Sequence, residues 1–327
     1  MARWQERRAQ MRAEDLGRLL LLSALWGGSF LFMRIAAPVL GPIVVAESRV
    51  LIAGIALLLY ACAAKRSMEL RSRWRQYLII GATNSAIPFT LIAAAQLRLP
   101  ASLAAILNAT SPLFGSVIAC IWVKDPLTLR KIGGLILGIA GVILLVGWSP
   151  MDLSIELALS IGACLMAAGF YGIASVYTKA KIAGAPSLGM AVGSQLGASL
   201  LLLPLIPIVP PFRPPSGGVL FCVLLLALGS TGLAYLLYFR LIVDVGPAKA
   251  LTVTFLVPIF GVTWGALILG EQITFSGLIG CAIILVGTSF VLGVHPRFTG
   301  IFSAFNREGN FARKKRIESS KAISYDI

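Results

Sequence analysis

Two segments of the chain, 101–142 and 247–288, carry the same residue pattern at one constant offset. The shared positions are Pro112 and Pro258, Phe114 and Phe260, Gly115 and Gly261, Asp125 and Glu271, Thr128 and Thr274, and Gly134 and Gly280. Between its two helices the first copy also carries three basic residues, whereas the second carries none. Because basic residues favour the cytoplasmic side of a membrane, the two copies are predicted to lie in opposite orientations. Duplicated, inverted apolar units are typical of secondary transporters.

The composition indicates that lipid is part of the solvent. Apolar residues make up 58% of the chain, charged residues make up 13%, and the mean hydropathy is +0.90. A soluble domain of 327 residues cannot bury that much apolar surface. The net charge of +15 does not predict a nucleic-acid partner, because the basic residues lie in tails and loops without a nucleic-acid-binding motif.

Ten apolar windows are long enough to cross a hydrocarbon core about 30 Å thick as helices. They cover residues 18–36, 43–63, 76–97, 102–123, 131–148, 155–178, 187–208, 217–240, 248–269 and 275–294. Five spans per repeat is an odd number, so the second repeat enters from the opposite side. The predicted fold is therefore an all-α membrane protein with ten transmembrane helices in two inverted five-helix repeats.

The predicted organisation has four parts: a basic N-terminal tail (1–17), a first repeat (18–148), a second repeat (151–294) and a basic C-terminal tail (295–327). The distribution of charge predicts that both tails are cytoplasmic. In that orientation all but four of the 28 Lys and Arg residues fall in inner segments.

No residue pattern predicts a metal or another cofactor. The cysteines are spread over separate apolar runs, and the lone His295 has no partner ligands around it. A membrane enzyme would need a cluster of His, Asp, Glu or Cys at membrane depth, which the sequence does not offer. We therefore expect no catalytic residues, no cofactor and no metal, and the alternatives of an enzyme or a non-transport scaffold are disfavoured.

Carriers of this architecture bind their substrates near the bilayer midplane, between the repeats. Polar and aromatic residues predicted at that depth suit a small amphipathic ligand held by ring contacts and a few hydrogen bonds. They are Trp26, Asn84, Asn108, Ser111, Tyr171, Tyr235, Tyr238, Thr252, Thr254 and Trp264. For each aromatic residue alone, packing or interfacial anchoring is the alternative interpretation.

Pro112 and Pro258 fall near mid-membrane at equivalent positions of the two repeats. Each removes a backbone hydrogen bond and is predicted to kink its helix. In lipid the freed carbonyl must face protein or a water-filled cavity, so these positions are candidate hinges or cavity walls. A packed kink is the alternative.

Three charged residues fall in outer halves of the first two spans: Arg34, Glu47 and Arg49. Residues two positions apart point to different sides of a helix, so Glu47 is not expected to pair with Arg49. An ion pair between Glu47 and Arg34, or snorkelling at the interface, is one interpretation. The functional alternative is that Arg34 or Arg49 attracts a ligand carboxylate in an outer vestibule.

Span seven carries Gly189, Gly193 and Gly197 on one face. Small residues at this spacing let two helices approach closely. The expected use is packing inside one chain, with a homodimer interface as the alternative, so the chain is predicted to be a monomer or a homodimer.

The stretches DPLTLRKIGGLILGIAGVILLV (125–146) and GEQITFSGLIGCAIILVGTSFVL (270–292) resemble the closing helix of each EamA repeat. The stretch LLLLSALWGGSFLFMRIAA (19–37), followed by Arg49 in the next span, resembles the start of the first repeat. Over residues 18–294 the chain therefore resembles the EamA type of the drug/metabolite transporter superfamily.

The resemblance implies a ten-helix carrier in a bacterial inner membrane, with a central cavity lined by spans 1, 3, 4, 6, 8 and 9. It also implies export of small molecules by alternating access. Amino acids, including aromatic ones, are the expected substrates, and the alternative is a multidrug or nucleotide-sugar carrier of the same superfamily. The scarcity of carboxylates at membrane depth favours facilitated diffusion or exchange over proton coupling.

Overall fold

The computed structural model describes residues 13–147, 154–182, 184–246 and 250–293, and every regular element in these ranges is a helix. The first repeat contains α2 (Ala13–Leu40), α3 (Pro42–Ala63), α4 (Trp74–Gly81), η1 (Ala82–Ala86), α5 (Ile87–Ala95), α6 (Ala101–Asn108), α7 (Ser111–Val123) and α8 (Leu129–Gly147). The second contains α9 (Ile155–Lys181), α10 (Ser187–Leu202), η2 (Leu203–Leu205), α11 (Gly217–Leu224), η3 (Leu225–Leu233), α12 (Ala234–Val245), α14 (Val253–Leu269) and α15 (Phe275–Leu292). Most of the predicted N-terminal tail and all of the predicted C-terminal tail lie outside the described residues.

The ten predicted spans are confirmed as helices. Nine helical stretches among the described residues are long and apolar enough to cross a membrane, some of them built from two or three consecutive elements. In the ninth predicted span, α14 begins at Val253 after a turn at residues 251–252, and residues 248 and 249 lie outside the described residues. At about 1.5 Å per residue, α14 covers only part of the hydrocarbon thickness by itself.

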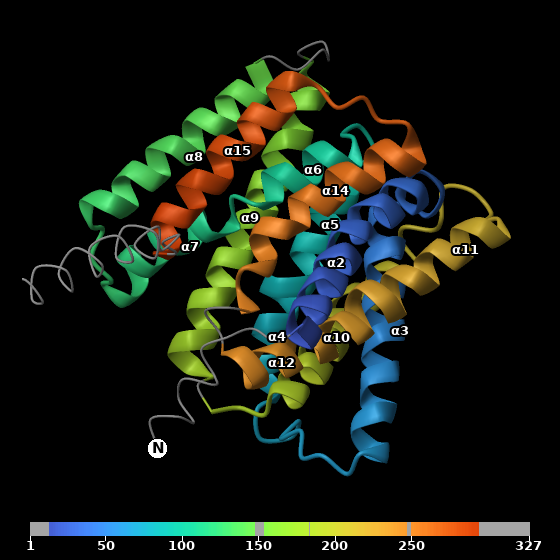
Figure 1. Cartoon of the computed structure of the whole chain (residues 1–327). Coiled ribbons are helices and arrows are strands. Elements are labelled where there is room, and N and C mark those ends of the chain that lie inside the picture. The colour runs from blue at the N-terminus through green and yellow to red at the C-terminus, as the bar shows by residue number, and fades with distance from the viewer. Residues whose placement is uncertain (1–12, 148–153, 183, 247–249, 294–327) are drawn as a thin grey trace, which may run out of the picture. The chain divides into compact units, whose positions relative to one another are not determined.

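The two closing helices α8 and α15 lie side by side and run antiparallel (Figure 1). A Cβ added at Gly134 would lie 2.6 Å from the carbonyl oxygen of Gly287, and one at Gly141 would lie 3.0 Å from that of Gly280. The residue numbers therefore rise along one helix while they fall along the other. Because α8 and α15 are the equivalent helices of the two repeats, their antiparallel packing shows that the repeats are inverted.

The repeats interleave and do not form separate bodies. Helix α2 of the first repeat packs along α14 of the second. Their equivalents, α9 of the second repeat and α7 of the first, also pack along each other. In both pairs two backbones meet at glycine: Gly27 against Gly261, and Gly172 against Gly115. Each repeat thus completes the packing of the other, which explains why one apolar core runs through both.

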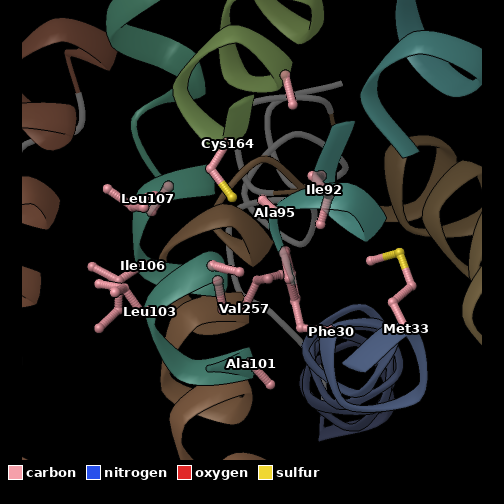
Figure 2. Packing of buried hydrophobic residues seen from close by; sticks show 14 of the residues in the cluster. Phe30, Met33, Ile92, Ala95, Ala101, Leu103, Ile106, Leu107, Cys164 and Val257 are labelled. Atoms are coloured by element: carbon pink, nitrogen blue, oxygen red, sulfur yellow. The ribbon is translucent and has the colours of Figure 1, made fainter. Parts of the chain in front are cut away.

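The largest buried apolar cluster lies where α2, α5, α6, α9 and α14 meet. Figure 2 shows Phe30 of α2 beside Ala95 and Val257, with Ile92 and Cys164 nearby. These side chains expose less than a tenth of their surface. They position the helix segments that border the site described below.

Glycines 189, 193 and 197 of α10 are all used inside the chain. Added Cβ atoms would meet Met68, Tyr77 and Leu78 of the α3–α4 region. The intramolecular interpretation of this glycine face is therefore correct, and the face is not free to form a dimer interface.

Three membrane-spanning stretches are irregular in the middle. Wide, π-type turns occupy η1 in the third span and η3 in the eighth, which are equivalent positions of the two repeats. The fourth span is broken between α6 and α7, just before Pro112, whereas Pro258 lies inside the unbroken α14. Such π segments are frequently found at functional sites, and hydropathy and repeat spacing do not predict them.

At the break before Pro112, two backbone carbonyls accept hydrogen bonds from side chains. Proline cannot donate to the carbonyl of Asn108, and the hydroxyl of Ser111 donates to that oxygen instead, at 2.6 Å. The neighbouring carbonyl of Ala109 accepts a hydrogen bond from Thr288 of α15, at 3.2 Å. These side chains stabilise the broken helix at membrane depth.

We expect Gly134→Ala and Gly287→Ala to destabilise the protein by about 1–3 kcal/mol, because each new methyl group meets backbone of the facing helix. Gly133 is the matched control, because it lies in the same helix and a Cβ there meets nothing within 4 Å. Thermal unfolding of the purified protein in detergent measures the effect. A Gly134→Ala variant as stable as Gly133→Ala would contradict the close packing of α8 on α15.

Candidate substrate cavity

A cavity of about 530 Å³ lies between the two repeats. It is lined by α2, α4 with η1, α5, α6, α7, α9, α12 with η3, and α14, which belong to the six spans expected to line it. Helices α3 and α10 also contribute, through Arg49 and through Met190, Ala191 and Ser194. A volume in this range is typical of sites that bind small molecules.

Most of the predicted cavity residues do line this cavity. They are Trp26, Asn84, Asn108, Ser111, Tyr171, Tyr235, Tyr238 and Thr254, together with both prolines, Pro112 and Pro258. The structure places Thr252 and Trp264 elsewhere: Thr252 precedes the first turn of α14, and the indole of Trp264 donates to the carbonyl of Ala24 at 3.1 Å. Trp264 thus connects α14 to α2 and does not face the cavity.

Aromatic rings form much of the cavity wall. The rings of Trp26 and Tyr238 face each other across the two repeats, with centroids 5.3 Å apart. Tyr235 stacks on Phe239 at 5.9 Å, and Tyr171 contributes from α9. Such a wall suits an apolar or aromatic ligand group, because ring contacts provide a large contact area with few internal rotations.

Neutral polar groups come from the irregular helix segments. Asn84 of η1 donates from its amide nitrogen to the hydroxyl of Tyr235, at 3.0 Å. Two further acceptors at the wall, Ser230 Oγ and Asn108 Oδ1, are buried and have no hydrogen-bond partner among the described residues. Because buried polar atoms are normally paired, these two are candidates to bind a ligand.

Arg49 lies in the cavity wall and not in an outer vestibule, which corrects its predicted place. Its side chain is almost fully buried, with the residue 4% exposed. The Nε donates to Thr231 at 2.8 Å, and the guanidinium lies 3.7 Å above the ring of Phe89. The wide turns of η3 orient this contact, because Thr231 in turn donates to the carbonyl of Leu226, five residues earlier.

Arg34 and Glu47 do not pair with each other, and neither lines the cavity. Arg34 donates to the backbone carbonyl of Gln96, whose own side chain donates to the carbonyl of Phe30 at 2.8 Å. Glu47 is buried against α10, where Ser199 donates to one of its oxygens at 2.6 Å. The proposed outer vestibule is therefore a set of helix-to-helix contacts.

The cavity extends toward the end of the bundle that carries the basic loops. At that end it is lined by Thr178 and Lys179, where α9 ends, and by Ile242 near the end of α12. Toward the opposite end Ala37, Leu99 and Ala101 expose no surface, and a separate, smaller pocket of about 110 Å³ lies beside Ser102 and Glu271.

At this end Glu271 connects the two repeats. Its two carboxylate oxygens accept hydrogen bonds from the backbone nitrogens of Ala101 and Ser102, at 2.6 and 3.0 Å, where α6 begins. A negative charge at a helix N-terminus is favourable, so the turn of one repeat fixes a helix of the other.

Comparison with known proteins gives consistent results. The EamA-like transporter family matches residues 18–147 and 158–293. The chain is similar to the uncharacterized transporter YvbV of Bacillus subtilis, with 26% identity over 84% of this chain and 89% of the relative. A chloroplastic WAT1-related protein of Arabidopsis thaliana is 25% identical over 81% of this chain and 66% of its own length. A solved crystal structure shares the fold with a TM-score of 0.61 and 18% identity, covering 86% of this chain and 96% of that one.

We expect a cysteine at Ser175, an exposed position on the cavity wall, to react with a membrane-impermeant maleimide from one side only. In a background without native cysteines, that side is the one from which Arg71→Cys is labelled, because both lie toward the basic end. Pro214→Cys, in the loop at the opposite end, is the control for the other side. Labelling of Ser175→Cys from the Pro214 side would contradict the described opening.

Proposed function

The chain belongs to the EamA-like transporter family, and we propose that it exports amino acids or similar small metabolites by alternating access. Membership of the family makes it a multi-pass membrane transporter and not an enzyme. The single observation that supports the finer proposal is the cavity between the inverted repeats, whose wall combines aromatic rings with neutral hydrogen-bonding groups. That combination fits a small amphipathic solute, including an aromatic or hydrophobic amino acid.

The two repeats supply the basis for alternating access. Because they are built alike and inverted, an exchange of their conformations would close the cavity at the basic end and open it at the other. The irregular elements η1 and η3 and the break before Pro112 border the cavity in both repeats. Local changes of helix geometry at these places would let the ends of the spans move while the glycine contacts between repeats stay in place.

The described lining residues include no Asp or Glu. A proton-driven carrier usually uses such a carboxylate, so the cavity favours facilitated diffusion or exchange. We further propose a bacterial inner-membrane location with both termini in the cytoplasm, because the basic loops then face inward. In that orientation the cavity described here opens to the cytoplasm, where a substrate for export is collected.

We expect the purified protein in liposomes to exchange labelled amino acids for unlabelled ones. Tyr235→Ala is expected to lower the exchange rate at subsaturating substrate about tenfold, because it removes a ring from the wall and the partner of Asn84. A loss of about 1.4 kcal/mol in binding corresponds to that factor. Ile139→Ala, on an exposed face of α8, is the matched control.

Two outcomes would contradict the proposal. Exchange of drugs or nucleotide sugars but not of amino acids would favour the other carrier types of the superfamily. Acceleration of amino-acid uptake by an imposed pH gradient would overturn the uncoupled mechanism.

A further inference from the structure

We infer that the cavity selects substrates that carry a carboxylate, and that Arg49 binds this carboxylate. The inference rests on the proposed transport function and adds the charge of the substrate and the residue that recognises it. It depends on how Arg49 is placed, on the charges of the cavity and on the unpaired acceptors opposite.

Arg49 has no ionic partner among the described residues. Its Nε donates a hydrogen bond to the hydroxyl of Thr231. Its Nη1 donates to the sulfur of Met33, with 3.7 Å between nitrogen and sulfur. No carboxylate lies within 4.0 Å of the guanidinium in the part of the chain that the structure describes. No described group accepts from Nη2, and Arg49 lines the cavity, so Nη2 is the guanidinium nitrogen that we infer donates to a ligand carboxylate.

Burial of an unpaired guanidinium is costly. Arginine stays charged in proteins, and a charge removed from water needs compensation by an opposite charge or by hydrogen bonds. The contact with the Phe89 ring and the bond to Thr231 offset only part of this cost. A ligand carboxylate would supply the missing charge, and an ionisable residue at membrane depth is most often functional.

The charges of the cavity point to the same class of ligand. Arg49 and Lys179 are the charged residues among the described lining residues, and neither is acidic. A ligand with only a positive charge would meet repulsion from Arg49 and would find no carboxylate. The cavity therefore disfavours cations, including cationic drugs, and favours anions and zwitterions.

The unpaired acceptors let a zwitterion bind as well as an anion. Ser230 is fully buried and its hydroxyl has no partner among the described residues, and Asn108 Oδ1 is in the same state. Either oxygen can accept a hydrogen bond from an ammonium group without adding a full negative charge. The aromatic wall formed by Trp26 and Tyr238 remains for the side chain of the ligand.

The test compares three probes that share one phenyl ring. 3-Phenylpropionate carries only a carboxylate, L-phenylalanine carries a carboxylate and an ammonium, and L-phenylalaninamide carries only an ammonium. We expect calorimetry on the detergent-solubilised full chain to show binding of the two carboxylate probes. The amide is expected to bind about ten- to a hundredfold more weakly, which is the usual contribution of a charge-assisted hydrogen-bonded pair.

Variants of Arg49 test the residue itself. We expect Arg49→Gln to weaken binding of both carboxylate probes by the same ten- to hundredfold while changing that of the amide little. Arg49→Lys should fall between, because lysine keeps the charge but loses the fork. Arg98→Gln is the matched control, because Arg98 lies at the opposite end and is more than half exposed. If Arg49→Gln does not fold, the comparison of the three probes on the unsubstituted chain and on Arg49→Lys decides.

Equal binding of the amide and of L-phenylalanine to the unsubstituted chain would overturn the inference, and so would tight carboxylate binding by a folded Arg49→Gln variant. Failure of every carboxylate probe to bind or exchange, while neutral or cationic solutes exchange in liposomes, would overturn the inference together with the proposed amino-acid specificity and leave only the transporter function of the family. Exchange of no solute class at all would instead overturn the proposed function.

Discussion

Close backbone contact between the inverted repeats is the interaction on which the rest of the structure depends. Glycine makes it possible at three places: between α8 and α15, between α2 and α14, and between α7 and α9. In lipid there is no hydrophobic force between helices, so van der Waals packing at small residues must hold them together. Because each of these contacts joins one repeat to the other, neither repeat has a complete interior alone. The walls of the cavity are accordingly drawn from both halves of the chain.

The irregular segments follow from a second constraint, the need to satisfy every backbone group at membrane depth. At the break before Pro112 this is achieved by the hydroxyls of Ser111 and Thr288. In η3 the wider turn brings Thr231 within reach of both the carbonyl of Leu226 and the guanidinium of Arg49. Departures from regular helix thus coincide with the cavity wall, which is where the backbone can be exposed to water instead of lipid. At the same places Ser230 Oγ and Asn108 Oδ1 have no hydrogen-bond partner among the described residues.

The sequence was sufficient for the spans, the inversion and most of the cavity, because hydropathy, charge and repetition each depend on residue type and spacing alone. It was not sufficient for the rotation of each helix about its axis. Trp264 lies in the expected span, yet it faces α2, where its indole nitrogen donates to the carbonyl of Ala24. Position along the chain predicts Arg49 in an outer vestibule, whereas its contacts with Thr231 and Phe89 hold it in the cavity wall. The wide turns of η1 and η3 are not predictable because no residue type marks them, and they are recognised only where the structure shows Asn84 and Thr231 with their tertiary partners.

The charge of the cavity depends on the directions in which the side chains of Glu47 and Arg49 leave α3. Two residues apart on α3, their side chains point to different sides, so the carboxylate cannot neutralise the guanidinium. Glu47 is instead held by Ser199 of α10, a helix that packs along α3, and this contact fixes the rotation of α3. With α3 so oriented, Arg49 must face the cavity. An acid at position 47 and a base at position 49 therefore give a net positive site, although the helix itself carries no net charge. A single ion pair between adjacent turns would have produced a neutral wall and no preference for an anion.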